Sequence, residues 1–221
     1  MIPVDLKFEQ DIAILTFDDG KANAVSHDFI DGMMSGLDSA ENEAKAVIIL
    51  GKPGMFSAGF DLKEIQKGPS EANALVERGA HMLFRLFGFP QPVIAGCSGH
   101  AVAAGAFTLL ACDTRIGVSG DFKLGLNETA IGMTLPVFGH QLAQNRLSKR
   151  HMTAAVIQSQ MYSPDEAVDA GFLDTVVLPD ELKTACITAA EQLMTLPTKT
   201  YGQMKRDTRR EPLAAIEASL A

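Results

Sequence analysis

The sequence predicts an α/β protein with a helical C-terminal region, and three observations support this fold class. Short apolar runs typical of buried strands recur along the first two thirds of the chain, where they alternate with segments of helical periodicity. Beyond about residue 179 only helical periodicity remains. The 221 residues are 47% hydrophobic and 21% charged, as expected of a globular chain with one sizeable core. We therefore expect a single domain that spans residues 1–221.

The chain opens with two predicted strands, a helix and a third strand. Residues 4–9 and 12–17 alternate apolar with polar side chains around Gln10-Asp11, a pattern typical of a β-hairpin. Ser26 is placed to cap a helix whose apolar side chains fall on one face, namely Phe29, Ile30, Met33, Met34 and Leu37. The apolar run 47–50, bounded by turn residues, then predicts a buried strand.

Helices and strands continue to alternate up to Glu128, and helices predominate after it. In the middle of the chain we expect helices over 62–67, 70–88 and 103–112, and strands over 92–97, 114–118 and 122–126. After Glu128 we expect helices over 136–147 and 149–158, one opened by the capping box Ser163-Pro-Asp-Glu166, a strand over 176–178, and helices over 180–195 and 199–220.

Charge and composition exclude several classes of protein. The formal net charge of −8 argues against binding to nucleic acid or to an anionic membrane, because both require a basic surface. The first 20 residues lack the pattern of a signal peptide, and no apolar stretch is long enough to span a bilayer, so we expect a cytoplasmic protein. Neither the three cysteines nor the five histidines have ligand spacing, and we predict no metal site.

Two loops, each between a predicted strand and a predicted helix, are candidates for a catalytic role. In residues 55–62, Gly59 allows a sharp turn and Asp61 can cap the following helix. In residues 96–106, small residues open a helix and leave its first N–H groups without partners. Two such loops can direct two N–H donors at one oxygen that gains negative charge. The alternative interpretation is that each loop is only a tight turn.

Glu128 is the candidate acid or base, because it follows a predicted strand and has mostly apolar neighbours in residues 125–136. A carboxyl group in an apolar pocket is expected to have a raised pKa, which suits it to remove and return protons near neutral pH. The alternative interpretation is a glutamate at the start of a helix, in contact with solvent.

Three segments together resemble consecutive signatures of the crotonase, or enoyl-CoA hydratase/isomerase, superfamily. They are Phe56-Ser-Ala-Gly-Phe-Asp-Leu62, Leu109-Leu-Ala-Cys-Asp-Thr-Arg115 and Leu124-Gly-Leu-Asn-Glu-Thr129, and the resemblance runs in order from the opening hairpin to about Pro179. It implies a spiral core of repeated β-β-α units over 1–178, a helical segment over 179–221, and a homotrimer or hexamer. It also implies an acyl-coenzyme A substrate, with coenzyme A as part of the substrate and no tightly bound cofactor.

The resemblance also implies roles for individual residues. Phe60 and Ala104 match the two positions whose N–H groups form the oxyanion hole, and Glu128 matches a catalytic carboxylate. Ala104 stands where the family usually has glycine, which leaves Gly105 as an alternative contact. The expected coenzyme A contacts are Lys21, Ala22, Ala24, Ala58, Gly59, Asp61 and Leu62.

Departures from the family pattern favour one activity. Hydratases of the family use two glutamates, and Phe107 occupies the position that matches the first of them. A single glutamate in Leu126-Asn-Glu-Thr129 resembles the Δ3,Δ2-enoyl-CoA isomerases of fatty acid β-oxidation. A hydratase or another lyase of the family remains an alternative, as does a non-catalytic acyl-CoA-binding member, which Phe107, Ala104 and the shorter C-terminal region support.

The C-terminal region also contains four basic residues, Lys205, Arg206, Arg209 and Arg210. Two interpretations remain open: these side chains bind coenzyme A phosphates, or they lie on a solvated helix face.

Overall fold

The computed structural model describes residues 3–220 and contains two β-sheets. Residues 1, 2 and 221, at the ends of the predicted domain 1–221, lie outside the described residues. The larger sheet has six strands in the order β1-β2-β3-β5-β7-β9, and the smaller has three in the order β4-β6-β8. The strands are β1 (Val4–Glu9), β2 (Ile12–Phe17), β3 (Ala46–Leu50), β4 (Gly54–Ser57), β5 (Val93–Cys97), β6 (Gly99–Val102), β7 (Thr114–Val118), β8 (Leu124–Gly125) and β9 (Thr175–Val177).

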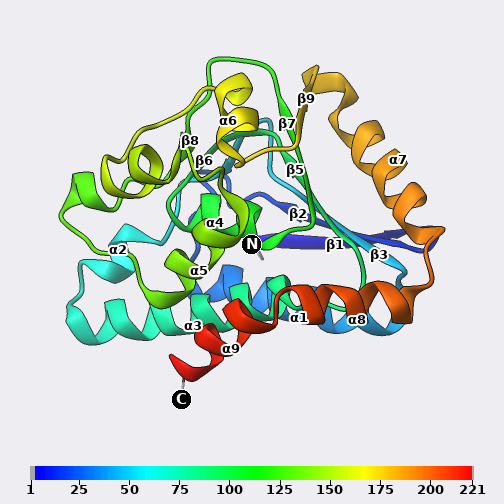
Figure 1. The fold of residues 1–221 in the computed structure, drawn as a ribbon, viewed down its shortest axis with the longest axis horizontal. Helices are drawn as coiled ribbons and strands as arrows, with labels where there is room; N and C mark the ends of the chain where they lie inside the picture. Colours follow the sequence, from blue (N-terminus) through cyan, green and yellow to red (C-terminus); the bar gives the residue numbers. More distant parts are fainter. Residues whose placement is uncertain (1–2, 221) are drawn as a thin grey trace.

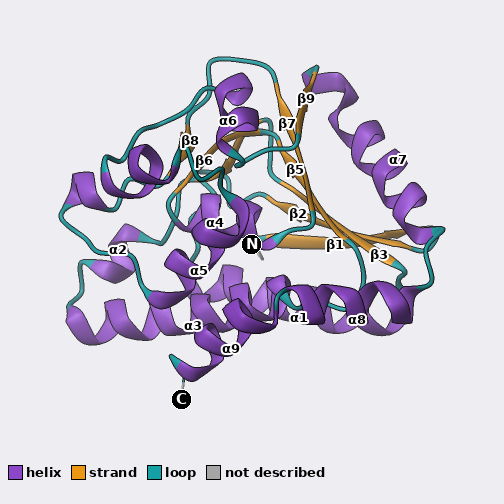
Figure 2. Cartoon of the chain, in the orientation of Figure 1, coloured by secondary structure: helices purple, strands orange, loops and turns teal. Residues whose placement is uncertain are grey.

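Helices surround both sheets (Figures 1 and 2). They are α1 (His27–Glu43), α2 (Leu62–Ile65), α3 (Pro69–Phe87), α4 (Ala104–Ala111), α5 (Val137–Arg146), α6 (Pro164–Ala170), α7 (Leu182–Met194), α8 (Thr198–Thr208) and α9 (Arg210–Ala218). Short 3-10 helices cover Thr129–Ile131 and Pro179–Glu181, and a π-helix covers Thr153–Ile157. As predicted, Ser26 caps α1 and the Ser163–Glu166 capping box opens α6.

From β3 onward the chain advances as a spiral in which successive strands alternate between the two sheets. β1 and β2 form the predicted antiparallel hairpin, and every later pair of neighbouring strands is parallel. β3 of the large sheet leads to β4 of the small one and then to α2 and α3, whereas β5 leads to β6 and then to α4. The predicted α/β spiral of β-β-α units is therefore confirmed, while a boundary at 178/179 stays a prediction.

The central strands are apolar because the large sheet is covered on both faces. In β2, Ile12 and Ile14 pack toward α7, whereas Ala13, Leu15 and Phe17 pack toward the helices of the opposite face. Successive side chains of a strand point to opposite faces, so continuous apolar runs are required here. Figure 1 shows α7 alone on its side of this sheet and the long helices α1 and α3 on the other.

Some expected elements differ from the structure. β4 and β6 were not predicted, because each has four residues that include glycine and polar side chains, without a clear strand pattern. The strand expected over 122–126 contains only Leu124–Gly125, and the helix expected over 149–158 is replaced by the π-helix Thr153–Ile157. These short elements depend on neighbouring strands and loops more than on their own sequence.

Neither interpretation of the C-terminal cations is correct for Lys205 and Arg209, which are each only 7% exposed. Their side chains form ion pairs with Asp113, Lys205 Nζ at 2.5 Å and an Arg209 terminal nitrogen at 2.9 Å. They also donate to main-chain oxygens at and just beyond the end of α3, namely Phe87 O (2.7 Å) and Phe89 O (2.7 Å). These two side chains therefore attach α8 and the start of α9 to the core.

Candidate active site

Three loops that carry predicted site residues leave the same edge of the small sheet. β4, β6 and β8 are neighbouring parallel strands, so their carboxyl ends lie at one edge. Residues 58–61 follow β4, residues 103–105 follow β6, and Glu128 follows β8 at a distance of three residues. Loops beyond the carboxyl ends of parallel strands are a common position for ligand sites in α/β proteins.

The first loop turns the Phe60 N–H away from Val25. Gly59 has a φ of 100°, which side-chain-bearing residues rarely adopt, and the chain turns sharply there as predicted. Val25 fixes the next residues, since its N–H donates to Gly59 O (2.8 Å) and its oxygen accepts from the Asp61 N–H (3.1 Å). Because successive N–H groups of extended backbone point in opposite directions, the Phe60 N–H points away from Val25. Asp61 caps α2 with its side chain, as predicted.

The second loop places Ala104 beside the first. Ala103 has a φ of 51° and donates its N–H to Gly125 O at 3.0 Å, which links the loop to β8. Ala104 is the first residue of α4, where backbone N–H groups have no partner within the helix. A Cβ placed on Gly59 would lie 3.5 Å from the Ala104 nitrogen, so the two loops are in contact. Gly105 packs against the main chain of Ser57, whose oxygen would lie 2.4 Å from a Cβ at position 105.

Glu128 is buried, with 6% of its surface exposed, which contradicts the alternative of a solvent-facing glutamate. Burial raises the pKa of its carboxyl group above the usual value, as predicted, and a hydrogen bond from its own N–H offsets this only in part. Within residues 3–220, Glu128 Oε2 and the neighbouring Asn127 Oδ1 are buried without a hydrogen-bond partner. Buried polar atoms without a partner are uncommon in folded proteins, and a catalytic role is one of the explanations for them.

The two residues after Glu128 are held by a distant segment of the chain. The Ala130 N–H donates to Ser159 Oγ at 3.1 Å, and the Thr129 hydroxyl donates to Val156 O at 3.3 Å. Val156 lies in the π-helix, and Ser159 has a φ of 52°, so both partners come from an unusual stretch of backbone. No sequence pattern predicts these contacts.

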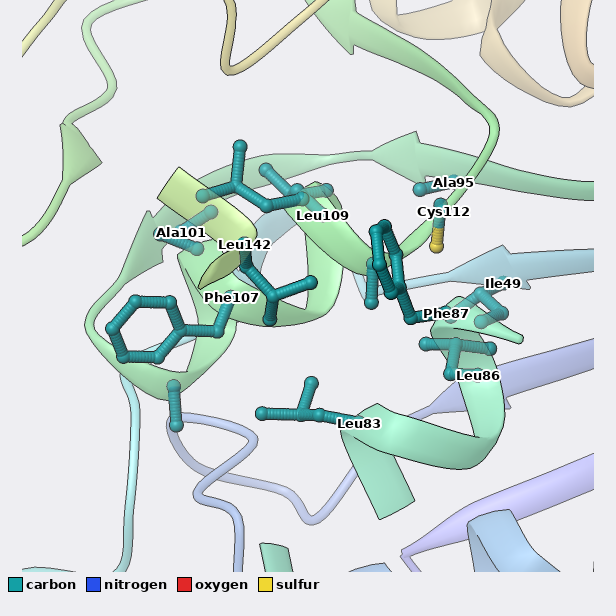
Figure 3. Packing of buried hydrophobic residues seen from close by; sticks show 14 of the residues in the cluster. Ile49, Leu83, Leu86, Phe87, Ala95, Ala101, Phe107, Leu109, Cys112 and Leu142 are labelled. Carbon is teal, nitrogen blue, oxygen red and sulfur yellow. The ribbon is translucent and has the colours of Figure 1, made fainter. Parts of the chain in front are cut away.

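Phe107 is a core residue, not part of a polar site. Its ring lies edge-on to Phe138 with centroids 5.5 Å apart, and it fills the space beside Gly139 in α5. Figure 3 shows it among buried hydrophobic side chains, with Leu142 of α5 near it. Position 107 therefore supplies no second carboxyl group.

A cleft of about 430 Å³ brings together most of the residues predicted to contact coenzyme A. Its walls contain Lys21, Ala22, Ala24, Ala58, Gly59, Phe60, Asp61 and Leu62, and in addition Asp19, Ser26 and Lys63, which sequence reasoning missed as site residues. Glu128, Ala104 and Gly105 do not line this cleft. A larger hollow of about 580 Å³ between β1 and α1 contains no predicted site residue.

Asp19 and Asn23 shape the turn that carries Lys21, Ala22 and Ala24. The Asp19 carboxylate accepts from the N–H groups of Lys21 (2.7 Å) and Asn23 (2.9 Å). Burial would raise the pKa of Asp19, but these hydrogen bonds and Lys52 outweigh it and hold the pKa below its usual value. The Asn23 amide lies within hydrogen-bonding distance of three main-chain oxygens of β2 and β4, so the turn is held against both sheets.

Residues 3–220 contain neither a membrane-spanning helix nor a cluster of side chains suited to a metal ion. The helices in this range are too short or too polar to cross a membrane. No cluster of three or more His, Cys, Asp or Glu side chains in the same range is arranged to hold a metal ion.

Comparison with known proteins identifies the family. The pattern of the enoyl-CoA hydratase/isomerase family matches residues 7–219, so the chain belongs to this family. A probable enoyl-CoA hydratase of Bacillus subtilis is 33% identical over 177 residues, which are 78% of this chain and 68% of that protein. The structure of an enoyl-CoA hydratase/isomerase family protein from Pseudomonas syringae matches with a TM-score of 0.97 at 40% identity, covering 99% of this chain and 95% of that one. The apo structure of an enoyl-CoA isomerase of Mycobacterium tuberculosis matches with a TM-score of 0.94 at 30% identity, covering 99% and 96%.

Proposed function

We propose that this protein shifts a double bond of an acyl-CoA thioester from the 3- to the 2-position. Glu128 removes a proton from the α-carbon, which the thioester carbonyl and the adjacent double bond acidify, and returns it to the γ-carbon. The dienolate formed between these steps carries its negative charge on the thioester oxygen, which the Phe60 and Ala104 N–H groups bind. Removal of one such donor costs on the order of 3 kcal/mol in other enzymes, so both N–H groups contribute substantially.

The buried carboxyl group of Glu128 carries this proposal. It has an oxygen without a partner among the described residues and a pKa that burial raises, which makes its protonated form more accessible and suits it to return a proton as well as to remove one. Addition of water by the two-glutamate route requires a second carboxyl group, and Phe107 at the matching position packs in the core. The similar Mycobacterium tuberculosis protein is described both as an enoyl-CoA isomerase and as a probable enoyl-CoA hydratase, so this similarity is compatible with both activities.

The test compares Glu128→Gln with Glu217→Gln, an exposed position on α9. We expect Glu128→Gln to bind acyl-CoA in calorimetry while isomerisation of 3-enoyl-CoA falls by several powers of ten, and Glu217→Gln to match the wild type. The wild-type kcat/KM should rise with pH through the raised pKa of Glu128, because the first step requires the carboxylate. Wild-type turnover in Glu128→Gln would end the proposal.

Hydration of a 2-enoyl-CoA is the second candidate, and the similarity to the probable hydratase of Bacillus subtilis favours it. Incubation with crotonyl-CoA distinguishes the two activities, since hydration removes the conjugated absorbance and isomerisation of a 3-enoyl-CoA creates it. Loss of crotonyl-CoA absorbance at a rate above that of 3-enoyl-CoA isomerisation would favour the hydratase. A panel of acyl lengths in both assays would define the substrate.

A further inference from the structure

β1 is an edge strand of the large sheet, and one side of its main chain is open. Among the described residues its only neighbour in the sheet is β2. The Asp18 N–H donates to Pro3 O at 3.1 Å, and hydrogen-bonded residues alternate along an antiparallel pair. The odd-numbered residues of β1 therefore bond to β2, whereas the N–H and C=O groups of Val4, Leu6 and Phe8 point to the open side. An edge strand of this kind is a template for pairing with another chain.

The side chains of β1 separate by kind onto the two faces of the sheet. Val4, Leu6 and Phe8 lie on the face that α1 covers, because each pairs with a β2 residue of that face. Phe8 is nevertheless 40% exposed. The side chains of Asp5 and Lys7 point to the opposite face, where they are 62% and 74% exposed. β1 thus offers an apolar row on one face and a pair of opposite charges on the other.

The hollow of about 580 Å³ between β1 and α1 lies beside the apolar row. Its lining includes two aspartates of α1 and the small or apolar residues Pro3, Val4, Leu6, Gly32, Ser35 and Gly36. Pockets of about 300 to 1,000 Å³ hold drug-sized ligands, so an aromatic side chain from a neighbouring strand fits here.

We propose that two copies of this protein pair through β1, antiparallel about a two-fold axis at Leu6, so that their large sheets become continuous. In this register Leu6 faces its own counterpart, and Val4 faces Phe8 of the second copy. All three outward-pointing residues then exchange main-chain hydrogen bonds with the second copy. The exposed ring of Phe8 covers Val4 of the other chain beside its hollow, and on the opposite face Asp5 meets Lys7. This contact is independent of the proposed function.

Charge selects this register over its neighbours. A two-fold axis at Asp5 places two aspartates opposite each other. An axis at Lys7 places two lysines opposite each other and Asp5 opposite Glu9. Like charges directly opposite one another destabilise a strand pair, whereas opposite charges stabilise it. A shift that places odd-numbered residues opposite even-numbered ones loses the main-chain hydrogen bonds, so the axis at Leu6 satisfies both the charges and the main chain.

The first experiment measures the mass of the particle in solution by light scattering. A two-fold contact joins chains in pairs, so the wild-type particle should contain an even number of chains. Lys7→Asp places carboxylates opposite each other and should halve this mass at the same protein concentration. Asp5→Lys/Lys7→Asp restores opposite charges and should recover the mass. Lys45→Asp is the matched control: Lys45 also pairs with an exposed carboxylate, Asp11 at 2.8 Å, but lies directly before β3, so the mass should not change.

The second experiment tests the register by oxidation of cysteine variants. Leu6→Cys should give a covalent dimer, because the Cα atoms of a hydrogen-bonded pair are about 5.5 Å apart, which suits a disulfide. Phe8→Cys should give none at the same rate, since the two copies of position 8 are about 14 Å apart along the strands. The three native cysteines are buried, so they leave this readout clear.

Any one of four results would overturn the proposal. They are an odd number of chains in the wild-type particle, an unchanged mass in Lys7→Asp, no recovery in the double charge variant, and equal rates of covalent dimer formation in Leu6→Cys and Phe8→Cys. Circular dichroism shows whether Lys7→Asp is folded. If it is not, the comparison of the two cysteine variants decides between the pairing and its absence.

Discussion

At the level of a single residue, the proposed catalytic role of Glu128 is opposed to the stability of the folded protein. Its carboxyl group is removed from water, and one of its oxygens has no donor among the described residues. A buried polar group without a partner destabilises the folded state by about 1 to 3 kcal/mol, and more when it is charged. The molecule retains this group although a neutral side chain would suit the surroundings better.

Glu128→Gln should therefore increase stability at alkaline pH. The pKa of Glu128 is raised in the folded state above the ordinary value of 4.5, so the folded protein holds this proton more tightly than the unfolded chain. Stability contributed by the protonated group is present below about pH 4.5 and is lost as pH rises through the folded pKa. The glutamine variant lacks this loss, so urea unfolding should show it more stable than the wild type at pH 8, with a smaller difference at pH 4. An equal difference in stability between Glu128→Gln and the wild type at both pH values would show that the ionisation of Glu128 is not the cause.

Glu128 could be singled out because it follows a predicted strand and has apolar neighbours, whereas Phe107 was singled out only through the family resemblance. The contacts of Gly79 with the Phe60 ring and of Ser159 with Ala130 were missed, since both join residues from distant parts of the chain. A glycine in the middle of a helical pattern was the available signal for position 79.

At the level of elements, the start of α4 is strained. Ala103 has φ and ψ of 51° and −120°, a combination that favours glycine, and it precedes the helix whose first N–H groups face the site. The adjacent strands are so short that pairing with their neighbours, together with bonds such as Ala103 N–H to Gly125 O, holds the loop in place. This explains why β4 and β6 were not recognised from sequence while the longer strands of the large sheet were.

Ala103→Gly should stabilise the protein by about 1 kcal/mol, because it removes a backbone strain of about 1 to 3 kcal/mol and adds the smaller entropy cost of glycine. Ala101→Gly in β6 is the control, and it should destabilise, since Ala101 is buried and is not among the residues with positive φ. Urea unfolding of both variants measures the difference. Equal destabilisation by both would show that position 103 carries no strain.

For the whole molecule, largely buried cations connect distant elements by binding main-chain oxygens at or beyond the ends of helices. Lys205 and Arg209 bind oxygens at and beyond the end of α3, Arg146 binds those of Cys112 and Asp113 beyond α4, and Arg115 binds Gly171 O beyond α6. The carboxyl end of a helix carries partial negative charge, and this charge stabilises cations that have too few carboxylates near them. Burial lowers the pKa of Lys205, and its ion pair with Asp113 offsets this only in part.

Asp113→Asn should destabilise the protein by about 3 to 5 kcal/mol, because it leaves two buried cations without their carboxylate. Asp207→Asn, which removes an ion pair between exposed residues on α8 and α9, should have a much smaller effect, because water and salt screen exposed charges. Urea unfolding gives both values, and hydrogen exchange should show faster opening of α8 in Asp113→Asn alone. Equal effects of the two substitutions would mean that the buried ion pairs do not hold α8.

The ion pair between Asp113 and Lys205 joins residues that are 92 positions apart, which has a consequence for folding during synthesis. At about 5 to 20 residues per second, a ribosome needs roughly 5 to 20 s to reach the lysine after it has added the aspartate. During that interval the carboxylate lacks this cation and keeps its water. The region around the end of α4 can therefore close completely only when the last helices emerge.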